Sequence, residues 1–166
     1  MMDMYFVKLL DIMNQETKLF EEINKIAEYK KSVIMDNNIQ ELENITKKEA
    51  GFTKAVMSLE KSKEDAIFNL CKDRDIDLVD NISELMSILN DVEKNQFNII
   101  RNSYVKSIDT FKKINDLNQA LLLQTLDYIN LKIDTANSID KQDIGYDTNA
   151  SEREVRIRKN LFDYKV

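Results

Sequence analysis

A chain of 166 residues is long enough to form one well-packed domain, and its 2 glycines, absence of proline and 33% charged residues favour long helices over a sheet. The formal net charge of −6 argues against a general affinity for nucleic acid, and no run of 18 apolar residues is present that would insert into a membrane. The chain has no histidine and only two isolated glycines, so it lacks the commonest general base, the Glu-x-x-His ligands of a helical di-iron site and a phosphate-binding loop, and we expect neither an enzyme nor a cofactor or metal site.

Residues 4–35 form the first predicted helix. Glu16 and Lys30 interrupt its apolar face, which is broader than a two-stranded zipper needs. We therefore expect this face to form the core of a bundle; a client-binding face is the alternative. Two adjacent rows of apolar residues repeat every seven positions along it: Phe6, Met13, Phe20, Ala27 and Ile34, and Tyr5, Ile12, Leu19, Ile26 and Val33.

The start of the chain and its cysteine content both bear on location. Asp3 stands where a signal peptide carries positive charge. The single Cys71 cannot form an internal disulfide, which is usual for proteins of a reducing compartment. We therefore expect a cytoplasmic protein.

A second helix is predicted from about residue 38 to residue 71. Asp36, Asn37 and Asn38 favour a turn, and Asn38 followed three residues later by Glu41 has the spacing of a capping box. Because the connection is so short, the second helix should return antiparallel to the first. Glu49 and Lys63 fall on the line of its apolar stripe, which consists of Leu42, Ile45, Phe52, Val56, Leu59, Ala66 and Leu70.

A charged stretch follows at residues 72–77, and we expect it to be a loop. Residues 78–89 then read as a short helix with Ile82, Leu85, Met86 and Leu89 on one side. Periodicity alone leaves open whether this short helix runs continuously into the next one.

The longest predicted helix spans residues 91–139 and contains no proline or glycine. Beside its stripe lie three polar residues, Asn115, Asn118 and Thr125. Two explanations for them stay open: a buried asparagine can select one helix register, and polar side chains can position an incoming helix. The stripe itself consists of Ile100, Tyr104, Phe111, Ile114, Leu121 and Tyr128.

The character of the chain changes after Ile139. Residues 140–150 are polar and contain Gly145, so we expect a flexible linker. Ser151 and Glu154 then form a second capping-box pattern, and a short helix over about residues 152–164 should order only against a surface, because so short a helix is marginal in water. Residues 152–164 contain four basic and three acidic residues, a net charge of +1 in contrast to the acidic bundle, and the segment can dock either on its own bundle or on a partner.

Together these elements predict an all-α protein. Residues 1–139 should form an elongated antiparallel bundle of three long helices and one short helix, and residues 140–166 a flexible C-terminal tail.

The residue pattern at positions 115–129 resembles that of a known family. The run Asn115-x-x-Asn118-x-x-Leu121-Leu122-x-x-Thr125-Leu126-x-Tyr128-Ile129 is similar to the Asn-x-x-Asn-x-x-Leu-Leu-x-x-Ser-Leu-x-Tyr-Ile signature near the end of the long helix in FlgN-type flagellar export chaperones. The turn at residues 38–43 is similar to the family's entry into its second helix. Gly145-Tyr146-Asp147-x-Asn149 stands where the family carries a Tyr-Asp-x-x-Gly tail, without the glycine after the tyrosine.

The resemblance covers essentially the whole chain and implies a cytoplasmic chaperone of the flagellar type III secretion system. Such proteins bind the C-terminal helical segments of the hook-filament junction proteins, which are the first and third hook-associated proteins. They keep these clients unpolymerised and hand them to the export gate, without nucleotide or metal. The resemblance implies client binding by the C-terminal part of the chain and docking to the export gate by Tyr146.

On this interpretation, the end of the long helix provides a groove and the tail folds over the client. The predicted client-binding residues are Asn115, Asn118, Leu121, Leu122, Thr125, Leu126 and Ile129 on the helix, and Val155, Ile157, Leu161 and Phe162 in the tail. Two alternatives remain. One is a homodimeric coiled-coil tether with no client, and the other is a chaperone for flagellin or for the filament cap.

Overall fold

The computed structural model describes residues 2–143, with side chains for residues 2–140. This part of the chain contains four helices and no strand: α1 (Met4–Met35), α2 (Ile39–Asp73), α3 (Ile82–Ser87) and α4 (Asp91–Asp143). The predicted all-α class, with three long helices and one short helix, is confirmed. The chain divides into two compact units, Met1–Thr125 and Leu126–Val166, here called unit 1 and unit 2. Each is described by itself.

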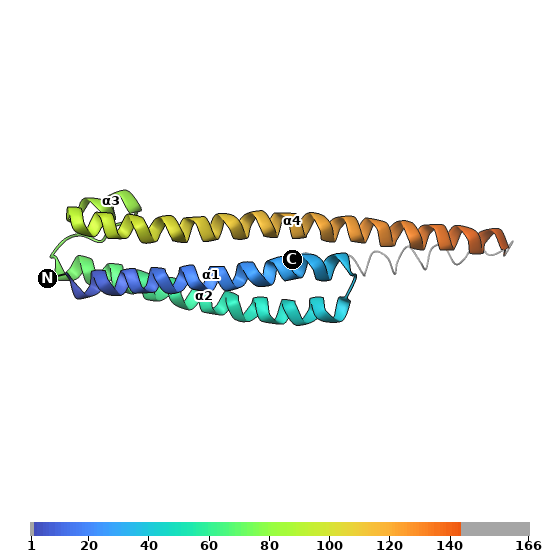
Figure 1. The fold of residues 1–166 in the computed structure, drawn as a ribbon, viewed down its shortest axis with the longest axis horizontal. Helices are drawn as coiled ribbons and strands as arrows, with labels where there is room; N and C mark the ends of the chain where they lie inside the picture. The colour runs from blue at the N-terminus through green and yellow to red at the C-terminus, as the bar shows by residue number, and fades with distance from the viewer. Residues whose placement is uncertain (1, 144–166) are drawn as a thin grey trace. The chain divides into compact units, whose positions relative to one another are not determined.

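In unit 1, α1 and α2 form an antiparallel hairpin (Figure 1). The turn between them places Asn37 at a positive φ of 52°, and the side chain of Asn38 caps α2 by accepting a hydrogen bond from the backbone N–H of Glu41 at 3.1 Å. This is the capping contact that the spacing of the two residues predicts. α1 has 32 residues and is therefore about 48 Å long.

Two ion pairs join α1 to α2. Glu16 of α1 pairs with Lys63 at 3.0 Å, and Lys30 pairs with Glu49 at 2.8 Å. The second pair lies 14 residues later along α1 and 14 residues earlier along α2, so both pairs fit a single antiparallel register. The four charges that interrupt the apolar stripes in the sequence are therefore each other's partners.

α4 packs beside α1 in a parallel orientation (Figure 1). The ring of Phe20 contacts Tyr104 and Phe111 with centroid distances of 6.2 and 5.9 Å, and the Asn24 side chain donates to the Ser107 carbonyl at 3.0 Å. In these contacts the α4 residue comes 83 to 91 positions after its α1 partner. The same offset brings the last residue of α1, Met35, level with the end of unit 1, which explains why the unit ends at Thr125.

Arg74 ties four elements together at one end of unit 1. Its Nε donates to Asp3 at 3.3 Å, its Nη1 to the Ile88 carbonyl at 2.7 Å and its Nη2 to Glu93 at 2.8 Å. Asp3 is the N-cap of α1, Arg74 is the C-cap of α2, and Glu93 forms a reciprocal capping box with Asn90 at the start of α4. We call this end the closed end.

The main hydrophobic core lies beside this arginine. Residues from all four helices contribute to it, and Phe6, Leu9 and Leu70 have no exposed surface. The core cluster consists of Phe6, Leu9, Leu10, Ile12, Met13, Ala66, Leu70, Leu85, Leu89 and Phe97. Burial of such side chains at about 25 cal/mol per Å² is the main stabilising contribution at the closed end.

The structure corrects the expected bounds of the short helix. Residues 78–89 were predicted to be helical, but only Ile82–Ser87 form α3. Asn81 is extended (φ −150°, ψ 169°) and its side chain accepts from the backbone N–H of Glu84, so the helix begins after it. At the other end the Asn90–Glu93 capping box starts α4 anew, so the short and long helices are not continuous.

Two further boundaries differ from the expected ones. Lys72 and Asp73, assigned from sequence to a loop, are the last residues of α2. α4 continues to Asp143, four residues past the expected end of the long helix, because no breaking residue occurs before Gly145. Among the described residues, no helix contains a segment apolar and long enough to cross a membrane.

The Glu16–Lys63 pair generates a prediction about stability. The Glu16 side chain is 2% exposed, so Lys63→Met leaves a buried carboxylate without its cation and should lower the free energy of unfolding by about 3–5 kcal/mol. The double variant Glu16→Leu/Lys63→Met should recover most of this loss, because it removes both charges. Urea unfolding of Lys63→Met, Glu16→Leu and the double variant measures both effects. If the loss in the double variant equals the sum of the losses in the two single variants, the pairing is contradicted.

The same pair predicts a pH dependence. Burial raises the pKa of Glu16 above its ordinary 4.5, although the hydrogen bond and charge of Lys63 oppose this. The folded state therefore binds the Glu16 proton more tightly than the unfolded state, and this contribution to stability is complete below pH 4.5 and is lost as pH rises through the raised pKa. The unfolding free energy of wild type relative to Glu16→Gln should fall from pH 4 to pH 7. Glu28→Gln, which removes an exposed carboxylate from α1, is the control; an equal trend in both variants would contradict the prediction.

Candidate functional site

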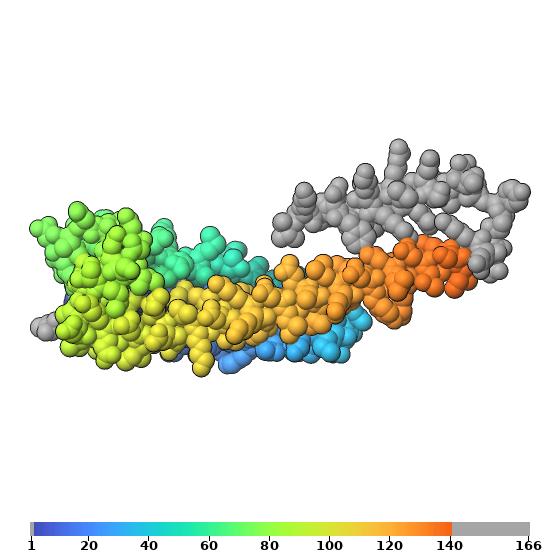
Figure 2. Space-filling model, turned by 90° about the horizontal axis from the view of Figure 1, so that it is seen from above, coloured from blue at the N-terminus to red at the C-terminus, as the bar shows by residue number. Residues whose placement is uncertain are grey.

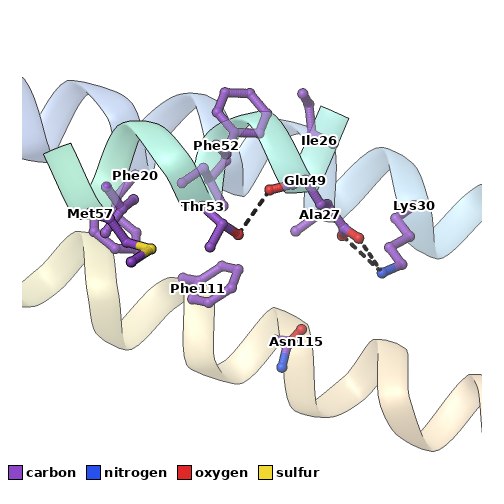
Figure 3. A pocket seen from close by; sticks show the side chains of 12 residues that line it. Phe20, Ile26, Ala27, Lys30, Glu49, Phe52, Thr53, Met57, Phe111 and Asn115 are labelled. Atoms are coloured by element: carbon purple, nitrogen blue, oxygen red, sulfur yellow. Dashed lines mark hydrogen bonds and ion pairs between the residues drawn. The ribbon is translucent and has the colours of Figure 1, made fainter. Parts of the chain in front are cut away.

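An apolar groove of about 380 Å³ lies between α1, α2 and α4 in unit 1 (Figure 3). Its lining residues in α2 come before Lys63, on the side away from the closed end. α1 forms its floor, and α2 and α4 form its walls. The lining residues are Phe20, Ile23, Ile26, Ala27 and Lys30 from α1, Glu49, Phe52, Thr53, Val56 and Met57 from α2, and Phe111 and Asn115 from α4. A concave apolar surface with a few polar groups is the usual form of a binding site.

The polar residues that line the groove are Lys30 on its floor and Glu49, Thr53 and Asn115 on its walls. The Thr53 hydroxyl donates to the Glu49 carbonyl of its own helix at 3.0 Å, and Glu49 itself is held by Lys30. Figure 3 shows the Phe111 ring of α4 directed toward Thr53 of α2, and Asn115 farther along α4. Asn115 is exposed, so its amide can meet an incoming polar group.

Asn118, one turn farther along α4, is placed differently from Asn115. Its side chain is 3% exposed and donates to the carbonyl of Ala27 in α1 at 2.8 Å. Its Oδ1 is buried and accepts no hydrogen bond within the described part of the chain. In this conformation Asn118 joins α4 to α1, which is the register-selecting role that the sequence left open, whereas its role in client binding stays a prediction.

The other predicted residues of unit 1 lie at the end of the bundle. Leu121, Leu122 and Thr125 are half-buried, and the Thr125 hydroxyl donates to the Leu121 carbonyl at 2.9 Å. Thr125 therefore satisfies its own hydroxyl group within α4. The two leucines keep part of their surface accessible.

The described part of unit 2 is the end of α4, and its apolar residues are exposed. Leu126 and Ile129 are 44% and 42% exposed, and with Ile133 they follow the i, i+3, i+7 spacing of one helix face. Other exposed large apolar residues in this segment are Tyr128, Leu131 and Ile139. An exposed apolar row of this kind marks an interaction surface.

The predicted tail residues lie outside the described residues. This applies to Tyr146, Val155, Ile157, Leu161 and Phe162, and to the short helix expected over residues 152–164. The structure therefore brings Asn115 together with the groove but shows no geometry for the tail.

Sequence reasoning missed the α2 wall of the groove. Phe52 and Val56 were assigned to an internal stripe together with core residues such as Leu70, because all of them share one helical period. The sequence signal is weak: Met57 follows Val56 directly and widens the stripe, and only the structure shows that Met57 is 67% exposed. A large apolar residue at the edge of a stripe indicates a surface that the chain itself leaves uncovered.

Comparison with known proteins gives one match. A family model described as FlgN protein matches residues 1–154. No curated protein and no solved structure matches the chain.

The two neighbouring asparagines generate a matched prediction. Asn118→Ala removes a buried hydrogen bond between α4 and α1 and leaves the Ala27 carbonyl unpaired, so it should lower the free energy of unfolding by about 1–3 kcal/mol. Asn115→Ala, on an exposed position of the same helix, should change it by less than about 0.5 kcal/mol. Urea unfolding followed by circular dichroism measures both; equal losses would contradict the structural role of Asn118.

Proposed function

The chain belongs to the FlgN family of flagellar export chaperones, and from this premise we propose that it binds the C-terminal amphipathic helices of hook-associated proteins. The bound chaperone prevents premature assembly of these clients in the cytoplasm and delivers them to the flagellar type III export gate. The family is not an enzyme family, and the proposed role needs only binding and release. The observation that carries the proposal is the family match over residues 1–154.

The exposed end of α4 supports this role physically. A client helix that will later be buried in the filament junction exposes apolar surface while it is a monomer, and a second apolar helix face can cover it. Burial contributes about 25 cal/mol per Å², and most of that gain is offset by the cost of ordering two partners. The remaining affinity can be high enough to hold the client and low enough to release it at the gate.

The proposed client surface comprises the residues singled out in the sequence. On α4 they are Asn115, Asn118, Leu121, Leu122, Thr125, Leu126 and Ile129. Leu126 and Ile129 are more exposed than Leu121 and Leu122, so they should carry most of the apolar contact.

The proposal also assigns roles to residues of the C-terminal tail, which are known from the sequence alone. Val155, Ile157, Leu161 and Phe162 fold over the bound client, and Tyr146 docks to the export gate. Basic residues around this apolar set favour a client with acidic flanks.

The first test is co-purification of the full chain with the C-terminal segments of the two hook-filament junction proteins. Selective capture of either segment at a 1:1 ratio is the expected result, and a flagellin segment is the control. Capture of flagellin or of the filament cap instead would assign the chain to a different client. Capture of none, together with a stable dimer by mass, would replace the proposal with a homodimeric tether.

The second test locates the surface. Leu126→Gln/Ile129→Gln should weaken client binding roughly tenfold or more with the helical content unchanged, because both side chains are exposed before binding. Leu131→Gln is the matched control, because Leu131 is 64% exposed and lies on the opposite side of the helix from Leu126 and Ile129. Equal affinities for the double variant and the control would remove Leu126 and Ile129 from the client surface.

The tail residues enter the same series of measurements. A variant with polar residues at the four apolar tail positions should weaken client capture. Unchanged affinity would contradict the proposal that the tail folds over the client. Tyr146→Ala should keep client capture but lower the amount of client exported by cells, and normal export would contradict its docking role.

A further inference from the structure

The short helix α3 occupies a distinctive place in unit 1. Its residues Ile82 and Leu85 line a cavity of about 160 Å³ together with Leu9 of α1, Ile67 of α2 and Phe97 of α4. α3 therefore lies over the seam where the three long helices meet, which is the position of the fourth helix in a four-helix bundle. With six residues, α3 is only about 9 Å long.

The seam continues beyond α3 toward the apolar groove. Lys63 and Tyr104 line the cavity at α3, and the Lys63 ammonium lies 5.1 Å from the centroid of the Tyr104 ring. One to two turns farther along α2 and α4 come Met57 and Phe111, which line the groove. In Figure 2 the green atoms of the α2–α3 region gather at one end of unit 1, and farther along α2 (teal) is seen beside α4. The groove is thus the continuation, without a covering helix from the described chain, of the seam that α3 fills.

We propose that this groove takes one amphipathic helix of the client, seated as the fourth helix of unit 1. The proposal rests on the proposed chaperone function and adds to it a docking site that includes α2, which no sequence pattern pointed to. α3 shows which chemistry the seam accepts, since it presents Ile82 and Leu85 to the seam at a spacing of three residues and Leu89 follows in the core. The client helix presents apolar residues at the same helical spacing.

The charges along the seam define the edges of the occupant. On the α2 side, Glu60 remains 45% exposed although it pairs with Lys63. On the α4 side, Arg101 lines the cavity at α3, and its Nε is buried and has no hydrogen-bond acceptor among the described residues. Both groups lie at the α3 end of the seam, so a client helix that extends from the groove to that end complements them with a basic residue on its α2 edge and an acidic residue on its α4 edge.

The binding free energy from apolar burial comes mainly from aromatic residues that the bundle itself covers only in part. Phe20, Phe52 and Phe111 line the groove and are all half-buried. Aromatic side chains in a pocket of this kind are the usual anchors of an interface, because they bury much surface for little lost conformational entropy. A leucine, methionine or phenylalanine of the client inserted beside Phe111 completes their burial.

The test fills the groove from each wall. Thr53→Trp on α2 and Asn115→Trp on α4 place a large ring in the groove and should weaken binding of the captured junction-protein segment about tenfold or more by titration calorimetry. The matched controls are Ser58→Trp, which lies five residues from Thr53 and faces another side of α2, and Asn102→Trp, which lies on the far side of α4. Both controls should change the affinity less than twofold.

A second measurement tests the proposal without a tryptophan variant, in case such a variant does not fold. Thr53→Cys carrying an environment-sensitive dye should shift its emission to the blue when the client segment is added, and Ser58→Cys with the same dye should not. Cys71 is buried and does not compete for the label.

The outcomes separate the two proposals. If wild type captures no junction segment, the chaperone function fails. If wild type binds the segment but the groove variants bind like their controls and the Thr53 dye does not respond, the groove proposal is overturned and the function stands. If the Thr53 dye responds to protein concentration alone and Asn115→Trp converts a dimer to a monomer, the occupant is a second copy of the chain, which also overturns the proposal.

Discussion

Unit 1 depends on four charges placed inside apolar seams. Glu16 and Lys30 interrupt the apolar face of α1, and each pairs with the residue that interrupts the facing stripe of α2. A buried charge without a partner costs several kcal/mol, so any other register of the hairpin is penalised most at Glu16, whose side chain is 2% exposed, and less at Glu49, whose side chain is 38% exposed. The pairs therefore act on specificity more than on stability, since an apolar pair of the same size would stabilise the hairpin as well. Once the register is set, the apolar residues of α1 and α2 that line the groove face the same side.

The two ends of the bundle differ in how the helices meet. At the closed end Arg74 donates at once to the N-cap of α1, to a backbone carbonyl and to a buried carboxylate, and the apolar core lies beside this group. Farther along, α4 is held to α1 by aromatic contacts and by asparagine bonds to backbone carbonyls, and the apolar side chains between α2 and α4 stay half-exposed. A well-packed end and an incompletely covered length fit the proposed binding and release of a client helix, because the covering surface forms without reorganising the core.

The fold could be predicted from sequence because the apolar periodicity and the capping residues of a helix are local features of the sequence. Apolar periodicity and the Asn38–Glu41 cap placed α1 and α2, and the same Asn-x-x-Glu spacing at Asn81 and Asn90 would have given the true starts of α3 and α4. The pairing of Glu16 with Lys63 and of Lys30 with Glu49 could not be predicted, because periodicity describes one helix at a time and does not show which residues of two helices meet. The groove was missed for a related reason: Phe52 and Phe111 have the same spacing as core residues, and only the arrangement of three helices decides which part of a stripe is covered.

The parallel arrangement of α1 and α4 has a consequence for how the protein folds. The ion pairs of the hairpin join residues 19 and 47 positions apart, whereas the bonds between α1 and α4 join residues 83 and 91 positions apart. On a ribosome the hairpin can therefore close long before α4 has been synthesised, and until then its apolar side lies open to water. α3 and then α4 cover that side as they are synthesised, so toward the nascent hairpin they act as the finished protein is proposed to act toward its clients.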